Sequence, residues 1–176
     1  MKDLVKISPE NDFDVILDIR YAGANNVTRQ KFYENDDCFL HQEAAQKLKN
    51  AVILAQEYDL KLKIFDGFRP LKAQEFLFAK FPDSGFVSDP KNGSIPHCRG
   101  IAVDLTLVDK NGKELEMGTD FDDFTELAFH SCKKLSGEAK KNRELLLKIM
   151  TKAGWDFFDN EWWHYQLFNP RSYKII

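Results

Sequence analysis

The segment Ile101 to Val108 is apolar at nearly every position and reads Ile-Ala-Val-Asp-Leu-Thr-Leu-Val. A strand that is covered on both faces reads as a nearly continuous apolar run, whereas a strand with one face in water alternates apolar and polar residues. The segment therefore predicts a central strand of a sheet. Residues 109–113, Asp-Lys-Asn-Gly-Lys, follow it directly and form a turn of the hairpin type.

Three helices are predicted from apolar residues that recur at helical spacing or from a proline at a helix start. They cover residues 41–58, 70–81 and 138–153. Three more strands are predicted at residues 13–20, 62–65 and 155–168. The strands and helices follow no regular βαβ order, so we expect an α+β fold, in which a central and mainly antiparallel sheet is flanked by helices. The length fits a single domain over residues 1–176.

The composition excludes several classes of protein. The net charge of −3 gives no basic surface of the kind that binds nucleic acid. The sequence has no long apolar stretch and no apolar N-terminal signal segment, so we expect no membrane association and a cytoplasmic location. The three cysteines, Cys38, Cys98 and Cys132, fit neither a disulfide framework nor a Cys-x-x-Cys zinc site, as expected where thiols stay reduced.

His97 lies four residues before the central apolar segment, and Asp104 lies within that segment. In a straight helix a spacing of seven separates two residues by about 10 Å. In a straight strand it places their side chains on opposite faces. Both can bind one ion only if the chain bends between them, and Gly100 is a suitable place for a bend. Taken alone, the pattern favours a loop histidine and a strand-end aspartate, because short His/Asp patterns are common by chance.

Glu161 and His164 enclose two tryptophans in the motif Glu-Trp-Trp-His. The aromatic context favours a loop-to-strand junction over a helical turn, and a core histidine beside a partly buried glutamate is the simpler alternative. Together with His97 and Asp104, however, the motif supplies two imidazoles, one carboxylate ligand and one spare carboxylate. A zinc peptidase needs this set, because three ligands hold the metal and the spare carboxylate moves protons.

Arg69 lies where a predicted strand ends and a predicted helix begins. A guanidinium at such a place can bind a carboxylate or stabilise an oxyanion, and a salt bridge to a local acid is the simpler use. The other histidines have structural interpretations. His41 is expected to begin a helix at the surface, and His130 lies in a Phe-rich amphipathic stretch.

Five segments, taken in order, resemble the D-alanyl-D-alanine dipeptidases, the VanX-type zinc peptidases that are related to D,D-carboxypeptidases. The matching residues are 18–22 (Asp-Ile-Arg-Tyr-Ala), 66–70 (Asp-Gly-Phe-Arg-Pro), 97–107 (His-x-x-Gly-x-Ala-x-Asp-Leu-Thr-Leu), 117–122 (Met-Gly-Thr-x-Phe-Asp) and 161–164 (Glu-Trp-Trp-His). Each segment is a weak signal alone. Five in one order across residues 18–164 are specific, and they outweigh the simpler interpretations given above.

The resemblance implies a fold like that of the hedgehog proteins and D,D-peptidases, and it implies hydrolysis of D-Ala-D-Ala in peptidoglycan precursor metabolism. The ligands of one Zn²⁺ per chain would be His97, Asp104 and His164. Glu161 would act as general base and then as general acid. Arg69 would stabilise the oxyanion, and Asp122 would face the ammonium group of the substrate.

One position departs from the family pattern. The family commonly has a serine two residues before the first histidine ligand, but this chain has Ile95 there, with Ser94 one step further away and Pro96 directly before His97. A hydroxyl group that would face the substrate is therefore missing or displaced, which bears on the preferred dipeptide and not on the metal.

Two alternatives to a dipeptidase remain at this stage. The first is a D,D- or L,D-carboxypeptidase that trims longer muropeptides, and the length of the cavity beside the Pro- and Gly-rich loop at residues 82–96 would decide between the two. The second is an inactive zinc-binding module. Such a module would be expected to lack the base or the arginine, whereas both Glu161 and Arg69 are present.

Overall fold

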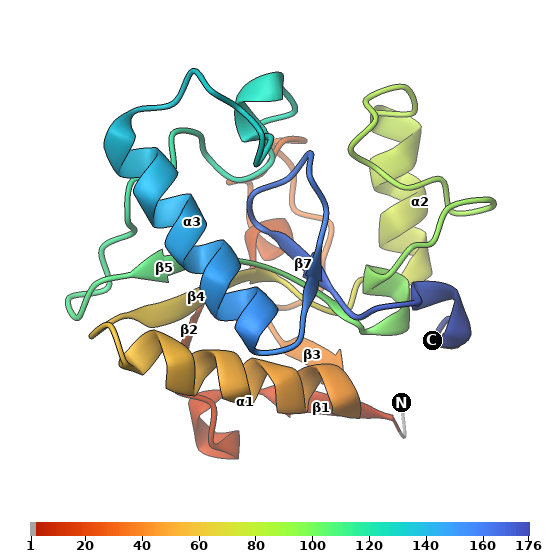
Figure 1. Ribbon diagram of the computed structural model, residues 1–176. Coiled ribbons are helices and arrows are strands. Elements are labelled where there is room, and N and C mark those ends of the chain that lie inside the picture. The colour runs from red at the N-terminus through yellow and green to blue at the C-terminus, as the bar shows by residue number, and fades with distance from the viewer. Residues whose placement is uncertain (1–2) are drawn as a thin grey trace.

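The computed structural model describes residues 3–176 and has a five-stranded sheet at its centre (Figure 1). The strand order is β2-β4-β5-β7-β6. The strands are β2 (Val15–Leu17), β4 (Lys61–Asp66), β5 (Ala102–Val108), β7 (His164–Gln166) and β6 (Asp156–Phe157). All pairings are antiparallel except β2 with β4. All seven residues of β5 are buried, so the prediction of a central strand in a mainly antiparallel sheet is confirmed.

Two of the predicted strands are shorter than expected. Only Val15–Leu17 of residues 13–20 pair in the sheet, because the chain then turns into a 3-10 helix at Arg20–Ala22, where the Arg20 guanidinium contacts Asp18 at 2.9 Å. Residues 155–168 form not one strand but two short antiparallel ones, β6 and β7, joined by a connection that contains Glu161. Aromatic content indicated extended chain here but not the position of the reversal.

A second sheet was not predicted. It consists of β1 (Leu4–Ile7) and β3 (Cys38–His41), which pair in antiparallel register. Each strand has four residues, too few for an alternating pattern to stand out from the surrounding sequence. This small sheet lies against α1 and brings His41 next to Gly100, whose carbonyl accepts a hydrogen bond from the His41 amide at 2.7 Å.

The three predicted helices are present within about two residues at each end. They are α1 (Gln42–Gln56), α2 (Leu71–Lys80) and α3 (Gly137–Lys152). His41 caps the N-terminus of α1, since its Nδ1 accepts a hydrogen bond from the Glu43 amide, which agrees with the structural interpretation of this histidine. Helices α1 and α3 contact each other and the sheet, α1 against β4 and α3 against β5, while α2 stands apart beside the 82–96 loop (Figure 1).

The core is built around β5 and the aromatic residues of β7 and its flanking connections. Trp155, Trp163 and Tyr165 are at most 1% exposed and pack in one cluster with the apolar residues of β4, β5 and the inner faces of α1 and α3. The two central strands that carry the polar site residues are therefore held on a rigid base. Across residues 3–176, no helix is both long and apolar enough to cross a membrane.

Candidate active site

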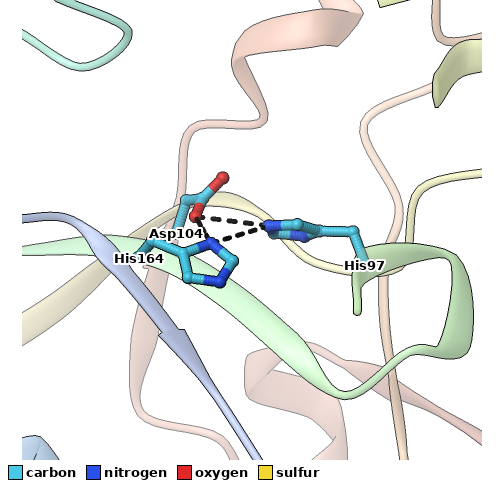
Figure 2. Close-up of side chains that lie close together, drawn as sticks. All are labelled: His97, Asp104 and His164. Carbon is cyan, nitrogen blue, oxygen red and sulfur yellow. Dashed lines mark hydrogen bonds and ion pairs between the residues drawn. The ribbon is translucent and has the colours of Figure 1, made fainter. Parts of the chain in front are cut away.

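Asp104 and His164 lie directly opposite each other on the neighbouring strands β5 and β7. Figure 2 shows that His97 points at the same place from the chain before β5. The distance from Asp104 Oδ1 to His164 Nδ1 is 3.0 Å, and His97 Nε2 lies 3.2 Å from His164 Nδ1 and 3.4 Å from Asp104 Oδ1. These three atoms, one from each residue, converge on a single point of the kind that one cation would occupy.

A bend at Gly100 brings His97 and Asp104 together, as expected. His97–Arg99 form a short 3-10 helix that ends at Gly100, whose φ of +67° lies in the left-handed region. A side chain at Gly100 would also collide with its surroundings, since a Cβ atom there would lie 2.7 Å from Leu4 Cδ2 and 3.0 Å from the His41 nitrogen. Both the conformation and the close packing therefore require glycine at this position.

The chemistry of the three donors fits zinc. The Nδ1 of His97 lies 2.8 Å from the Gly67 carbonyl oxygen, and a carbonyl only accepts, so this nitrogen carries the hydrogen and Nε2 offers its lone pair to the cluster. All three side chains are buried. Burial alone would raise the pKa of Asp104, but the adjacent His97 and His164 lower this pKa below its ordinary value, so the carboxylate is charged. Two imidazoles and one carboxylate form a set of ligands that suits zinc and leaves a further coordination position open.

Glu161 lies beside the three donors at the junction that leads into β7. Its Oε2 is 3.7 Å from His164 Nδ1, and its carbonyl oxygen accepts a hydrogen bond from the His164 amide at 3.2 Å. Burial raises the pKa of this carboxyl group to about 8. A cation bound to the adjacent donors would act in the opposite direction and favour the carboxylate. A carboxyl group in such a position can exchange a proton near neutral pH.

Arg69 enters the site from the chain between β4 and α2. Its Nε and Nη2 donate to Asp66 Oδ2 at 3.0 and 2.8 Å, and its Nη1 donates to Gln74 Oε1 at 2.9 Å. The salt bridge to a local acid is therefore present, and Nη2 also lies 3.7 Å from Asp104 Oδ2 at the metal cluster. These three hydrogen bonds use three of the five guanidinium N–H groups, which leaves two for a ligand.

Asp122 lies across the cavity and is held by two donors. The Tyr21 hydroxyl donates to Oδ1 at 3.1 Å, and the Val27 amide donates to Oδ2 at 3.4 Å. The residue has a left-handed backbone with φ of +60°. Burial, and secondarily the charge of Asp104, raise the pKa of Asp122 to about 7. Its buried carboxyl group would ionise more readily against a cationic group.

One cavity of about 500 Å³ contains all of the predicted site residues. Its polar end holds the groups described above, and its other walls come largely from the 82–96 loop and from aromatic side chains. The aromatic lining residues are Tyr21, Phe78, Phe86, Phe124, Phe158 and Trp163. Ser94 and Ile95 both line the cavity, so the position that departs from the family pattern lies at the site itself. Ile95 has a left-handed backbone with φ of +39°.

A family model described as D-Ala-D-Ala dipeptidase matches residues 12–174. The chain belongs to this family. The D-alanyl-D-alanine dipeptidase of Escherichia coli K12 is 37% identical over 174 residues, which are 99% of this chain and 88% of the relative. The D-alanyl-D-alanine dipeptidase of Enterococcus faecalis is 31% identical over 170 residues, which are 85% of this chain and 84% of the relative. The resemblance inferred from the five segments is confirmed.

Among solved structures, the LD-carboxypeptidase LdcB is similar to this dipeptidase-family chain with a TM-score of 0.57 at 18% identity. The alignment covers 98% of this chain and 71% of LdcB. At this identity the likeness concerns the fold, and it confirms the α+β class predicted from the sequence.

Several residues of the site were not predicted, among them Asp66, Tyr21 and Gln166. Asp66 holds the Arg69 guanidinium, Tyr21 holds Asp122, and Gln166 contacts His164, with its Oε1 3.1 Å from His164 Nε2. Asp66 and Tyr21 lie in segments that carried the family resemblance. The resemblance therefore included these positions, but it did not predict the contacts that the two side chains make. No sequence signal indicated Gln166, because its contact depends on the two residues facing the same side of β7.

Proposed function

We propose that this protein is a zinc-dependent dipeptidase that hydrolyses D-Ala-D-Ala to two molecules of D-Ala in peptidoglycan precursor metabolism. The observation that carries the proposal is the convergence of His97, Asp104 and His164 on one point, with Glu161 and Arg69 beside them in one cavity. Family membership gives the substrate class, since the matching family and its curated relatives are D-Ala-D-Ala dipeptidases.

Each group of site residues has a different role in the proposed reaction. His97, Asp104 and His164 would hold one zinc ion, which when bound lowers the pKa of a coordinated water to about 7 and polarises a carbonyl group. Glu161 accepts a proton from the attacking water and later delivers it to the nitrogen of the leaving amine. The two remaining N–H groups of Arg69 stabilise the negative charge that develops on the oxygen of the scissile carbonyl.

Substrate orientation follows from the charges in the cavity. Asp122 would pair with the ammonium group of the dipeptide, and the Tyr21 hydroxyl fixes the carboxylate in place. Asp66 neutralises part of the Arg69 charge and limits its rotation, so that the guanidinium stays aimed at the metal cluster. This arrangement orients a small zwitterion between an acid and a base on one rigid sheet.

The location and the organisation of the chain are also part of the proposal. Cys38, Cys98 and Cys132 are all unpaired, which supports a reducing compartment such as the cytoplasm. One continuous cluster of buried residues links the large sheet with α1 and α3, which supports a single domain. The substrate would then be a free dipeptide rather than the cell-wall polymer.

Three peptides test the proposed function. We expect zinc-loaded protein to release D-Ala from D-Ala-D-Ala, to spare L-Ala-L-Ala, and to act poorly on a pentapeptide that ends in D-Ala-D-Ala. Equal or faster hydrolysis of the pentapeptide would instead indicate a carboxypeptidase. No hydrolysis of any of the three peptides would contradict the peptidase function.

A further inference from the structure

Gln166 and His164 lie two residues apart on β7, so both side chains project from the same face of the strand. Two residues along a strand are separated by about 6.7 Å, a gap that a glutamine side chain can bridge. Opposite Gln166 on β5 stands Ala102, just as Asp104 stands opposite His164. The small alanine leaves room at this level of the sheet, and Gln166 lines the cavity.

The two histidines of the cluster present different nitrogens to it. His97 offers Nε2, and its Nδ1 is fixed by the Gly67 carbonyl oxygen at 2.8 Å. His164 offers Nδ1, and its Nε2 lies 3.1 Å from Gln166 Oε1. The outer hydrogen-bond partner of one ring is therefore main chain, whereas that of the other ring is a side chain.

A neutral imidazole carries one hydrogen, and the nitrogen that carries it cannot bind a metal. For Nδ1 of His164 to be a ligand, the hydrogen must lie on Nε2, where the amide oxygen of Gln166 can accept it. The same hydrogen bond opposes a half-turn of the ring about its Cβ–Cγ bond, which would move Nδ1 away from Asp104. Phe158 packs edge-on against the ring, with centroids 6.4 Å apart, but offers no hydrogen-bond acceptor.

We propose that Gln166 is a positioning residue that holds His164 in the tautomer and ring orientation required for metal binding through Nδ1. The inference rests on the proposed function, because it takes His164 as a zinc ligand. Outer partners of metal-bound histidines typically change metal affinity by 10- to 100-fold when they are removed.

Two substitutions at the same position separate this task from simple packing. Gln166→Met keeps an unbranched side chain of similar length but has no strong acceptor, whereas Gln166→Glu keeps an acceptor for the Nε2 hydrogen. The measurement is the zinc dissociation constant, obtained by competition with a chromophoric chelator in the absence of substrate. Gln46→Met, at an exposed position of α1, makes the same chemical change away from the site and serves as the control.

We expect Gln166→Met to bind zinc 10- to 100-fold more weakly than the parent protein, and Gln166→Glu and Gln46→Met to stay within about threefold of it. Imidazole ¹⁵N NMR of the zinc-loaded proteins should show zinc on Nδ1 and the hydrogen on Nε2 of His164 in the parent, and a mixture of two ring states in Gln166→Met. Unchanged zinc affinity of Gln166→Met, or equal losses in the Met and Glu variants, would overturn the inference. Failure of the parent protein to bind zinc would instead reject the proposed metal site.

Discussion

Asp66 is fully buried beneath the site and binds several groups at once. Its Oδ1 accepts from the Tyr33 hydroxyl at 2.8 Å and from the Gly67 amide at 2.9 Å, and its Oδ2 accepts from Arg69. One carboxylate thus fixes the arginine and the turn that carries the carbonyl partner of His97. A buried ion pair of this kind is strongly destabilising when one partner is removed, because the other charge is left without compensation.

Replacing Asp66 should therefore affect both stability and catalysis. We expect Asp66→Asn to lower the free energy of unfolding by about 3 kcal/mol, as measured by urea denaturation. Catalysis should also fall, because the Arg69 guanidinium loses its charged anchor. The matched control is Asp37→Asn, which removes an acid from an exposed pair with Lys6 and should leave stability and turnover unchanged. Equal effects of the two substitutions would contradict the positioning task of Asp66.

Glu161 should be separable from the metal ligands by substitution. Glu161→Gln keeps the shape of the side chain but removes the proton acceptor, so we expect kcat to fall by about 10²- to 10⁴-fold while zinc content stays the same. Metal analysis and steady-state kinetics on one preparation measure both properties. Glu126→Gln, at an exposed position, is the control. Retained turnover in Glu161→Gln would place the base elsewhere.

At the scale of elements, the bend before β5 determines whether the metal site can form. Gly100 combines a φ of +67° with contacts that leave no space for a Cβ atom, whereas Gly85 has a φ of +75° but nothing within 4 Å of its Cβ position. Substitutions at the two glycines therefore separate two contributions to the free energy of unfolding, that of the left-handed backbone conformation and that of close packing.

We expect Gly85→Ala to lower the free energy of unfolding by about 1 kcal/mol, the conformational cost alone. Gly100→Ala should cost about 3 kcal/mol, since it adds a clash with Leu4 and the backbone at His41. Zinc affinity should fall only in Gly100→Ala, because His97 shifts with the bend. The measurements are urea denaturation and zinc competition. Equal costs at both positions would show that packing at Gly100 is not a constraint.

The elements that could be predicted from the sequence are those with a strong local pattern. Helices α1 and α3 and the strand Ala102–Val108 follow from their apolar patterns, and helix α2 follows from the proline at its start. The pair β1 and β3 could not be predicted, because strands of four residues are specified by pairing between distant segments rather than by their own pattern. The reversal between β6 and β7 was missed for the same reason.

The residues of the site also differ in how far they could be predicted from the sequence. His97, Asp104, Glu161 and His164 were singled out by the chemistry of two short motifs, and the family resemblance gave each of them its predicted role. Arg69 was singled out by its place between a strand and a helix and given its role by the resemblance, whereas Asp122 was assigned through the resemblance alone. The contact of Gln166 with His164 could not be predicted, since a glutamine in a strand has many possible partners and only the geometry of β7 selects one.

For the molecule as a whole, buried titratable groups determine how stability depends on pH. Burial lowers the pKa of His130 to about 4, and its imidazole packs against Phe157 and Tyr165. Unfolded His130 titrates near 6.5, so below that pH the unfolded chain binds a proton that the folded chain excludes. The stabilising contribution is therefore present above pH 6.5 and is lost as the pH falls toward 4.

Comparison of the parent with His130→Gln isolates this contribution from the other titrating groups. We expect the free energy of unfolding of the parent to fall between pH 6.5 and pH 4 by up to about 3 kcal/mol more than that of the variant. Urea denaturation at several pH values measures the difference. Parallel pH profiles of the two proteins would contradict burial of a neutral His130.

Titration of metal-free protein with zinc, followed as D-Ala release from D-Ala-D-Ala, tests the metal site and the reaction together. We expect no activity without metal, activity that rises in proportion to added zinc and levels off at one ion per chain, and no recovery in His164→Ala, because two ligands rarely hold zinc tightly. Full activity of the metal-free protein, or the absence of D-Ala release from the zinc-loaded protein, would contradict the proposed dipeptidase.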